Sequence, residues 1–448
     1  MARFITEPKK RLPVIGSYDV VVAGGGPAGV ASAVTAARLG AQVLLVEAMG
    51  CLGGLTTSGL VPCFAPFSRT KTPLIKGFAW EVLQRLRRLD GVGYRRNTIH
   101  WVTINAEKLK FLYDRMAEEA GVRVLFFTLV ADVIREKDRI RAIVIENKDG
   151  RRAVAGKVFI DATGDADLAA RAGVPFEKGD EKGRMQGTTL CFTVAGIDTR
   201  KYFRFGRKHP GNQKFTDWLE ENLRRGRLKR MRGCEYRMIA PLPLCPGVIN
   251  YNFGHVFGID GTKACDLSVG IAKGRELACN FLEFGRKNIP GMENAQLVAT
   301  GAILGVRETR RIDGNCRLTA DDYRSARHFP DDIALSDYPV DMHQSTASKR
   351  AFERMMKAYF DVLPRGKSYG IPYRSIVPKR VKNLLVPGRA LSSDRTMQGT
   401  ARIIPVCMAT GQAAGTAAVL SIQRHVPVGK VNIRELRAAL ARQGVRLA

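Results

Sequence analysis

The sequence predicts an α/β fold, in which a mostly parallel sheet with flanking helices carries a second, α+β domain. Three observations support this prediction. A strand, a glycine turn, a helix and a second strand follow one another in residues 18–47, two later apolar strands also end in glycine turns, and the segments between them have mixed helix and strand patterns. A chain of 448 residues, 45% of them hydrophobic, can bury a large core divided into about two or three domains.

The first strand leads directly into a glycine-rich turn. Residues 18–23 (YDVVVA) form an apolar run typical of a buried parallel strand, and the GxGxxG pattern of Gly24, Gly26 and Gly29 follows it. Gly24 permits the tight turn, Gly26 leaves no Cβ between the backbone and a pyrophosphate, and Gly29 lets the next helix lie close to the strand. This order of features predicts a dinucleotide-binding unit.

The helix after the turn begins with Pro27 and Ala28, is rich in alanine and stops at Gly40. Proline suits the first helical turn because its missing N–H would have no partner there, and the helix dipole favours a phosphate at this end. The second strand, residues 42–46, ends in Glu47, whose carboxylate is placed to accept hydrogen bonds from ribose hydroxyls. A carboxylate there disfavours a 2′-phosphate, and the position of the unit near residue 20 favours FAD as the dinucleotide.

Two later segments repeat the pattern of a buried strand that ends in glycine. Residues 157–165 (KVFIDATGD) hold such a strand, and residues 383–388 (NLLVPG) hold another that ends in Gly388. The first strand is followed by a turn that returns the chain to the nucleotide, formed by Thr163, Gly164 and Asp165. Residues 407–420 predict a small-residue helix, whose N-terminal end with Met408 is expected beside the flavin, where its dipole would stabilise negative charge on the reduced ring.

These segments resemble the FAD-dependent oxidoreductase family of the glutathione-reductase-type flavoprotein superfamily. The resemblance rests on GGGPAG, GCLGGLTTSGLVP, IDATGDAD, GVRETRRIDG, NLLVPGR and ARIIPVCMATGQAAG, which are spread from Tyr18 to Leu420. It implies a tightly bound FAD, a Rossmann-like FAD-binding domain and an inserted substrate domain. It also implies that the backbone near Gly53 and Gly54 approaches the cofactor and that Val130 contacts the adenine.

Two departures from the relatives affect what the resemblance implies. In many members of the wider superfamily the late strand ends in Gly-Asp, with the aspartate holding the ribityl chain, whereas here Gly388 is followed by Arg389. Members of the family often carry this Gly-Arg, so the FAD expectation stands while the ribityl partner is left open. Residues 392–405 (SSDRTMQGTARIIP) lack the histidine expected in this stretch, and no catalytic role is carried over to it.

The segments that resemble flavoproteins imply a discontinuous domain organisation. The FAD-binding domain is expected to comprise residues 15–65, 120–175 and 370–430. The substrate or cap domain is expected to comprise residues 66–119 and 176–369, and residues 431–448 to form a C-terminal surface helix. Within these parts the patterns predict short antiparallel strands in residues 121–147, a helix capped by Asn105, a second helix over residues 266–286 and a strand-rich segment at residues 187–197.

The formal net charge of +30 is large for an enzyme. Basic residues cluster in residues 85–96, 201–232 and 349–382, so the charge is spread along the chain. A solvated basic surface explains it most simply; attraction of an anionic substrate and contact with nucleic acid are the alternatives. The chain shows no helix-turn-helix or zinc-finger spacing, and no C-terminal helical extension like that of the longer flavoproteins that modify tRNA.

Cysteine usage and hydropathy bear on the compartment. Nine cysteines, without CxxC spacing or a Cys/His cluster, predict free thiols and no metal site. No segment matches a run of roughly 18 apolar residues that would span a membrane, and residues 1–16 lack a stretch of signal-peptide type, so a cytoplasmic location is expected. Cys51 is expected to pack beside the flavin, with covalent attachment or redox chemistry as alternatives.

Four polar residues are the candidates for catalysis. A flavin exchanges hydride at N5, so the protein has to orient a substrate, move a proton and stabilise charge. Arg307 in GVRETRR is placed to clamp a carboxylate, His255 and His343 are candidate acid or base groups, and Arg402 precedes the flavin-facing helix. Tyr373 is a further candidate beside these four. For each of these residues a structural role is the alternative.

We therefore expect an FAD-dependent oxidoreductase that transfers hydride between flavin N5 and a carbon centre of a small metabolite, with an anionic one favoured by the charge. A tRNA- or nucleic-acid-associated flavoprotein and a non-catalytic flavin-binding protein are the alternatives. No second strand-GxGxxG-helix unit follows Gly164, so no dedicated NADH or NADPH domain is expected. Oxygen, a quinone or a soluble carrier would then exchange electrons with the flavin.

Overall fold

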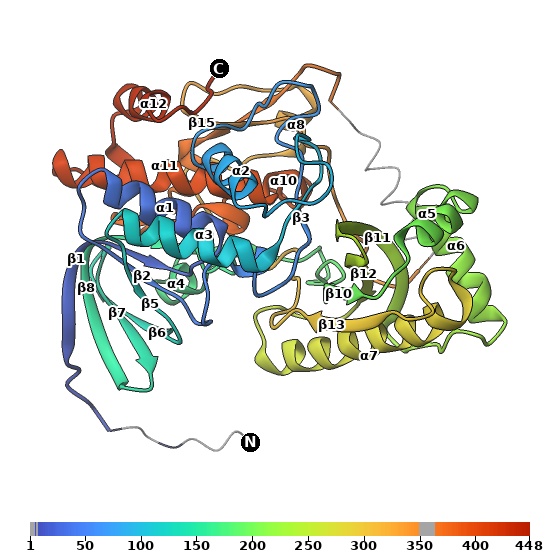
Figure 1. Cartoon of the computed structure of the whole chain (residues 1–448). Helices are drawn as coiled ribbons and strands as arrows, with labels where there is room; N and C mark the ends of the chain where they lie inside the picture. The colour runs from blue at the N-terminus through green and yellow to red at the C-terminus, as the bar shows by residue number, and fades with distance from the viewer. Residues whose placement is uncertain (1–4, 6–7, 349–362) are drawn as a thin grey trace.

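The computed structural model describes residue 5 and residues 8–348 and 363–448. Part of the third basic cluster, residues 349–362, lies outside this range. Figure 1 shows a main sheet with helices stacked above it, and a second sheet beside them with a long helix along its lower side. This mixed α/β architecture with a parallel-rich sheet confirms the fold class that the sequence predicts, at the level of a Rossmann-like nucleotide-binding fold.

The main sheet has seven strands in the order β5-β2-β1-β8-β7-β6, with β17 beside β8. Pairing is parallel between β5, β2, β1, β8 and β17, and antiparallel between β8, β7 and β6. The bounds are β1 Val14–Ala23, β2 Val43–Val46, β5 Arg123–Leu125, β6 Leu129–Glu136, β7 Arg139–Asn147, β8 Gly150–Asp161 and β17 Leu384–Leu385. The glycine turns after β1, β8 and β17 therefore meet at one edge of the sheet, where the carboxyl ends of parallel strands bind ligands.

Small residues allow two helices of the layer above the sheet to cross very closely. These are α1 (Pro27–Arg38) and α11 (Ile404–Gln423). A Cβ added at Gly411 would lie 2.2 Å from the carbonyl oxygen of Ala28, and one at Gly415 would lie 2.4 Å from that of Ser32. The Ser32 hydroxyl donates to the carbonyl of Gly411 at 2.9 Å. By length and hydropathy α11 passes the test for a membrane-crossing helix, but 94% of its most apolar window is buried inside the protein, as in a core helix.

The second sheet is antiparallel, in the order β11-β12-β10-β13. Its strands are β10 Phe192–Ala195, β11 Cys234–Cys245, β12 Val248–Val256 and β13 Gln296–Thr300. Three helices pack with it into a separate core, namely α5 Thr199–Lys208, α6 Gly211–Arg224 and α7 Ala264–Asn288. Aromatic contacts hold this core together, such as the stack of Phe192 on Tyr251 at 5.2 Å and the contact of Phe253 with Phe281 at 4.1 Å.

Two helices and a strand pair lie in the first core, although all of their residues except 370–372 were expected in the cap domain. They are α2 Phe78–Arg88, α3 Ala106–Glu119, β15 Asp332–Ser336 and β16 Tyr369–Pro372. Tyr113 of α3 is fully buried and its hydroxyl donates to the sulfur of Met408 in α11 at 3.7 Å. The amphipathic pattern of α3 indicates that one face is buried, but not which part of the molecule covers it. The second core thus lies within residues 192–295.

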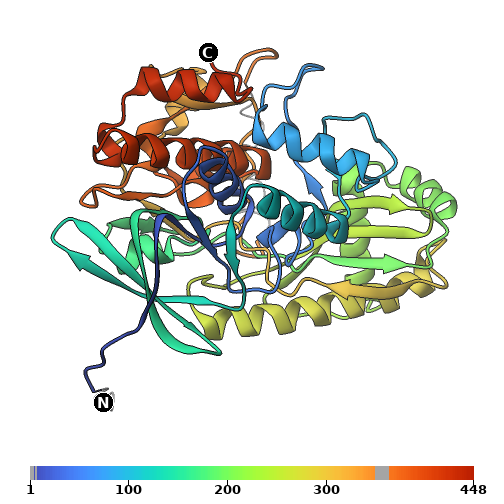
Figure 2. The same ribbon diagram turned by 60° about the vertical axis from the view of Figure 1, so that its left-hand side comes forward.

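Further helices and strands complete the fold. They are β3 Cys63–Phe64, β4 Val102–Thr103, α4 Asp167–Arg171, β9 Phe176–Lys178, β14 Arg310–Ile312, α8 Ala320–Arg324, α10 Arg395–Ala401 and α12 Ile433–Arg442. The cap predicted for α3 is confirmed, because the Asn105 side chain accepts hydrogen bonds from the backbone of Glu107 and Lys108. In Figure 2 the second sheet and α7 extend away from the main sheet. Helices α2 and α3 pack in the first core.

The α1–α11 crossing predicts a specific sensitivity to one methyl group. We expect Gly411→Ala to lower the free energy of unfolding by about 1–3 kcal/mol, since overpacking against backbone forces the helices apart. The matched control is Gly206→Ala in α5, where an added Cβ meets no atom within 4 Å and stability should stay the same or rise. Thermal unfolding followed by circular dichroism compares the two variants, and equal midpoints would contradict the prediction.

Candidate functional site

The three glycines of the turn after β1 face different surroundings. An added Cβ would lie 2.5 Å from the Ala162 carbonyl oxygen at Gly24 and 1.8 Å from the Gly24 carbonyl oxygen at Gly29, so the fold itself excludes larger residues there. At Gly26 the nearest atom would be 3.9 Å away. Gly26 is also the N-cap of α1 and no side chain caps that end. Space and unused N–H groups at the start of a helix are what a pyrophosphate requires.

The carboxylate of Glu47 lies beside this turn. It accepts hydrogen bonds from the backbone N–H groups of Gly25 at 2.6 Å and Met49 at 2.8 Å. Burial raises the pKa of Glu47, although these hydrogen bonds act in the opposite direction. A carboxylate has about four acceptor sites, so two hydrogen bonds leave capacity for the ribose hydroxyls that the sequence predicts.

Arg389 follows Gly388 directly and binds the turn after β8. Its guanidinium donates to the Asp165 carboxylate at 2.6 Å and to the Gly164 carbonyl at 2.9 Å, and it also donates to the Val306 carbonyl. Thr309 donates to the same Asp165 oxygen at 2.6 Å. Burial raises the pKa of Asp165, while the charge of Arg389 lowers it. Arg389 and Asp165 therefore hold two glycine turns together.

Some of the other residues expected at the cofactor lie at the glycine turns, and others do not. Gly54 lies beside the glycine turn, because an added Cβ there would be 3.1 Å from the Cα of Gly26, and Gly388 lies beside Ala28 in the same way. Thr163 donates to the Asp161 carboxylate at 2.7 Å and closes the turn after β8. In contrast, the Met408 side chain lies fully buried in the first core. Gly53 is in the left-handed conformation, and Val130 is half-buried in β6.

A cavity of about 380 Å³ lies where the two cores meet. Part of its wall is apolar and comes from both regions, with Leu55, Val61, Met238, Ile403 and Ile404 as examples. Since Ile403 and Ile404 stand at the start of α11, this helix points its N-terminal end at the cavity. Three of the four predicted catalytic residues line it, namely Arg307, His343 and Arg402.

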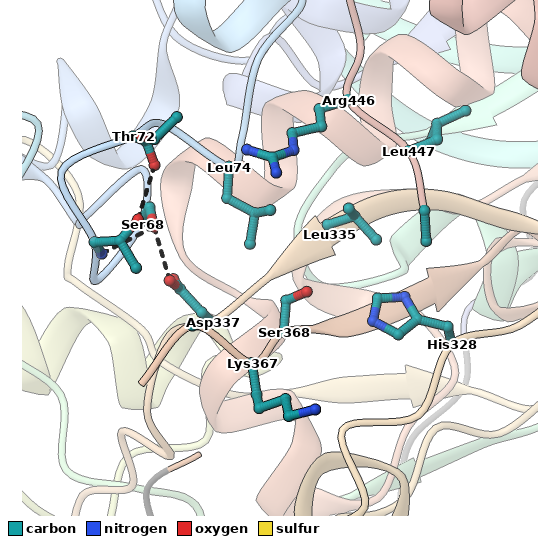
Figure 3. Close-up of a pocket in the computed structure, with 13 residues that line it drawn as sticks. Ser68, Thr72, Leu74, His328, Leu335, Asp337, Lys367, Ser368, Arg446 and Leu447 are labelled. Atoms are coloured by element: carbon teal, nitrogen blue, oxygen red, sulfur yellow. Dashed lines mark hydrogen bonds between the residues drawn. The ribbon is translucent and has the colours of Figure 1, made fainter. Parts of the chain in front are cut away.

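Another hollow, of about 270 Å³, lies elsewhere and is shown in Figure 3. Polar side chains surround it, and Ser68 donates to the Asp337 carboxylate at 2.8 Å. The hollow shares no lining residue with the cavity and contains none of the predicted site residues. We therefore take the cavity as the candidate active site.

Arginine predominates among the charged groups of the cavity, where three arginines and one aspartate line the wall. Arg307 donates to the Gly187 carbonyl at 2.6 Å and to the Thr189 hydroxyl at 3.0 Å. Burial, and then the charge of Arg402, lowers the pKa of Arg307 to about 10. Arg307 is therefore a buried cation at neutral pH that donates hydrogen bonds to two neutral groups.

Asp341 contacts Arg402 and His343. Arg402 donates to the Asp341 carbonyl at 2.7 Å, and its Nε is buried without a partner in the described part of the chain. His343 Nε2 lies 3.2 Å from the Asp341 carboxylate. Burial alone would raise the pKa of Asp341, but His343, Arg402 and Arg307 hold it well below its usual range. Asp341 is therefore ionised.

The two histidines are in contact, and only His343 lines the cavity. His255 Nε2 lies 2.8 Å from His343 Nδ1, and His255 Nδ1 lies 2.9 Å from the Glu235 carboxylate. Burial lowers the pKa of His255 to about 4, although Glu235 acts in the opposite direction. Burial and the charge of Arg307 lower the pKa of His343 well below its usual range. Both imidazoles are neutral at pH 7. His255 contacts His343 but does not line the cavity.

Asp341 and Glu235 belong to the site but were not among the predicted residues, whereas Tyr373 was predicted and lies elsewhere. Asp341 stands two positions before His343, and this proximity was a usable signal. Glu235 gave no local signal, because it meets His255 only through the pairing of β11 with β12. Tyr373, in contrast, is buried in the first core, where its hydroxyl donates to the Val428 carbonyl at 2.8 Å. Tyr373 therefore has a structural role.

Comparison with known families agrees with a nucleotide site at the glycine turns. The model of the FAD dependent oxidoreductase family matches residues 19–440. The chain belongs to this family. Its cofactor is FAD, and the open space at Gly26 together with the remaining acceptor capacity of Glu47 fits that dinucleotide.

Individual relatives are more distant. The chain is 29% identical over 160 residues to a thiamine thiazole synthase of Methanococcus aeolicus, and 28% identical over 197 residues to digeranylgeranylglycerophospholipid reductase 2 of Methanothermobacter thermautotrophicus. These matches cover 34% and 40% of the chain and 57% and 48% of the two relatives, so the chain spans about half the length of each. A solved structure of a geranylgeranyl bacteriochlorophyll reductase-like protein from Thermoplasma acidophilum is 14% identical, with 96% of this chain and 84% of that one covered at a TM-score of 0.47.

The glycine turn gives a prediction that separates cofactor binding from folding. Gly26→Ala should leave the stability of the FAD-free chain unchanged, because its methyl group would meet no atom closer than 3.9 Å, and should weaken FAD binding by at least tenfold, which corresponds to about 1.4 kcal/mol. Gly29→Ala is the contrasting variant and should destabilise the FAD-free chain itself. Flavin absorbance per protein and the unfolding midpoint of the stripped protein measure the two effects. Full FAD occupancy in Gly26→Ala at low FAD concentration would refute the assignment.

Proposed function

We propose that this chain is an oxidoreductase of the glutathione-reductase type, which transfers hydride between flavin N5 and a carbon centre of a small metabolite carrying a carboxylate or a similar anionic group. The observation that carries the proposal is the pairing of a buried arginine, Arg307, with a half-buried one, Arg402, in one cavity with a single lining carboxylate, Asp341. Burying like charges together is unfavourable unless an anion joins them. An anionic substrate would supply that charge.

The residues at the carboxyl edge of the main sheet would hold FAD. Gly26 and the start of α1 would receive the pyrophosphate and Glu47 the adenosine ribose, while Arg389 and Asp165 keep the neighbouring turns in place. When bound, FAD supplies a flavin N5 that accepts or donates hydride. The N-terminal end of α11 would favour negative charge near the ring.

The cavity residues would orient the substrate and manage its proton. The planar guanidinium of Arg307 suits two parallel hydrogen bonds to a carboxylate, and Arg402 adds a second donor. His343 would take the proton from the carbon-bound hydroxyl or amine of the substrate during oxidation, or return it during reduction, because it is neutral and lines the wall. Leu55, Val61 and Ile404 would exclude water from the reacting atoms.

The anion site can be tested before the natural substrate is known. Benzoate, with benzamide as its neutral counterpart, should perturb the flavin spectrum of the FAD-loaded protein with saturation. Arg307→Met should raise the Kd of benzoate by about 10- to 100-fold, since a hydrogen bond to a charged group contributes about 1.5–3 kcal/mol. The control is Arg317→Met, at an exposed arginine paired with Glu177. Equal binding of benzoate and benzamide, or an unchanged Kd in Arg307→Met, would remove the carboxylate from the proposal.

A second test concerns the source of electrons. In the described residues the second sheet is antiparallel, and we propose that no dedicated nicotinamide domain exists. Anaerobic stopped-flow mixing of the oxidised protein with NADH or NADPH should leave the flavin absorbance unchanged on the timescale of turnover. Rapid, saturable bleaching by either nucleotide would show that a nicotinamide docks in the cavity instead.

A further inference from the structure

Two buried polar atoms that belong to lining residues of the cavity have no hydrogen-bond partner within residues 8–348 and 363–448. One is the Nε of Arg402, and the other is the side-chain oxygen of Asn252. The first is a donor and the second is an acceptor. A buried polar group is costly when it stays unpaired. A ligand that supplies both an acceptor and a donor would therefore match this wall.

The strand register explains why Asn252 finds no partner among its neighbours. Asn252 lies in β12, between β11 and β10 of the second sheet (Figure 1). On the β11 side it pairs with Ala240, whose side chain has no polar atom. On the β10 side Phe192 pairs with Tyr251 in an antiparallel register, which places Cys191 beside Asn252. A thiol is only a weak donor, so neither neighbouring side chain offers a strong hydrogen bond to the amide oxygen.

Asn250 shows how the same residue type is satisfied two positions earlier in β12. Alternate residues of a strand face the same side of the sheet, so the two asparagines share one face. The Asn250 oxygen accepts from the Thr193 hydroxyl at 2.9 Å, and its amide nitrogen donates to the Ile104 carbonyl at 3.4 Å. Asn250 does not line the cavity, whereas Asn252 does. The unpaired oxygen thus belongs to the asparagine at the ligand site.

Thr189 fixes where Asn252 lies relative to Arg307. The Thr189 hydroxyl accepts from Arg307 at 3.0 Å and donates to the Gly254 carbonyl at 2.7 Å. Gly254 is two residues from Asn252 in β12, and residues with this spacing lie about 7 Å apart along a strand. The guanidinium and the amide oxygen are therefore two anchor points on one wall, about 7 Å apart.

We propose that Asn252 recognises a hydroxyl or an amine of the substrate, about 7 Å from the carboxylate that Arg307 binds. The proposal rests on the proposed function, in which Arg307 binds that carboxylate. The recognised group is separate from the one that exchanges a proton with His343, because His343 contacts His255, three residues from Asn252 in β12. The substrate class is thereby narrowed to small carboxylates with a second hydrogen-bond donor, and Asn252 determines specificity.

Substituted benzoates test this second anchor point in the FAD-loaded protein. 4-Hydroxybenzoate carries a donor opposite its carboxylate, 4-methoxybenzoate carries an acceptor only, and benzoate carries neither. Calorimetric titration should give the wild type a Kd for 4-hydroxybenzoate about 3- to 10-fold below that for benzoate, the effect of one neutral hydrogen bond. 4-Methoxybenzoate should show no gain over benzoate, because two acceptors cannot pair.

Variants of the asparagines separate recognition from a structural role. Asn252→Leu removes the oxygen at similar size, so it should abolish the hydroxyl preference and leave the unfolding midpoint unchanged or higher. Asn252→Asp keeps an acceptor and should restore the preference, while its charge weakens the binding of all three benzoates. Asn250→Leu is the matched control. It should lower the midpoint, since Thr193 and Ile104 lose a partner, and should keep the hydroxyl preference.

Three results would overturn the proposal. They are equal Kd values for benzoate and 4-hydroxybenzoate in the wild type, tighter binding of 4-methoxybenzoate than of 4-hydroxybenzoate, and a hydroxyl preference that persists in Asn252→Leu. The first two need no variant, and a purely structural role for Asn252 predicts the third together with a lowered midpoint.

A neutral pair of probes distinguishes failure of this proposal from failure of the proposed function. 4-Hydroxybenzamide and benzamide differ by the same hydroxyl but lack the carboxylate. A hydroxyl preference within this pair, in a protein that does not distinguish benzoate from benzamide, would refute the carboxylate substrate and retain the role of Asn252. A wild-type protein that binds neither hydroxylated probe would overturn that role as well.

Discussion

The close crossing of α1 and α11 is the constraint on which both ends of the site depend. Gly411 and Gly415 let α11 pack against the backbone of α1 at Ala28 and Ser32. The first helix begins at the glycine turn that receives the pyrophosphate, and the second begins at the cavity wall with Ile404. Because helices are stiff, this contact sets how far apart the nucleotide turn and the substrate cavity lie, and an extended dinucleotide has to match that separation.

A second link connects the nucleotide edge to the cavity through Arg389. The same guanidinium binds Asp165 after β8 and the carbonyl of Val306, one residue before Arg307. Thr309 reaches the same carboxylate from the other side of Arg307. Arg389 therefore ties the segment that carries Arg307 to the turn after β8.

Short sequence motifs predict the nucleotide-binding turn of this site. Gly24, Gly26 and Gly29 indicate their turn because they lie in one short motif, and Asn105 indicates a helix because a cap acts within one turn. The rest depends on pairings across long sequence separations. Glu235 meets His255 through a strand register interrupted by bulges, and periodicity carries no information about such a register. The burial of α3 against α11 is another pairing of this kind.

The net charge of +30 illustrates why composition alone did not identify the site. Most of the 72 basic residues can be solvated, and in water a pair of charges at 4 Å interacts by only about 1 kcal/mol. At the effective dielectric constant of about 20 that suits partly buried groups, the same pair interacts by about 4 kcal/mol. Arg307 and Arg402 are in that setting, with Asp341 as the carboxylate on the wall. The functional meaning of the charge therefore depends on these two guanidinium groups of the cavity and on the two histidines that burial keeps neutral near them.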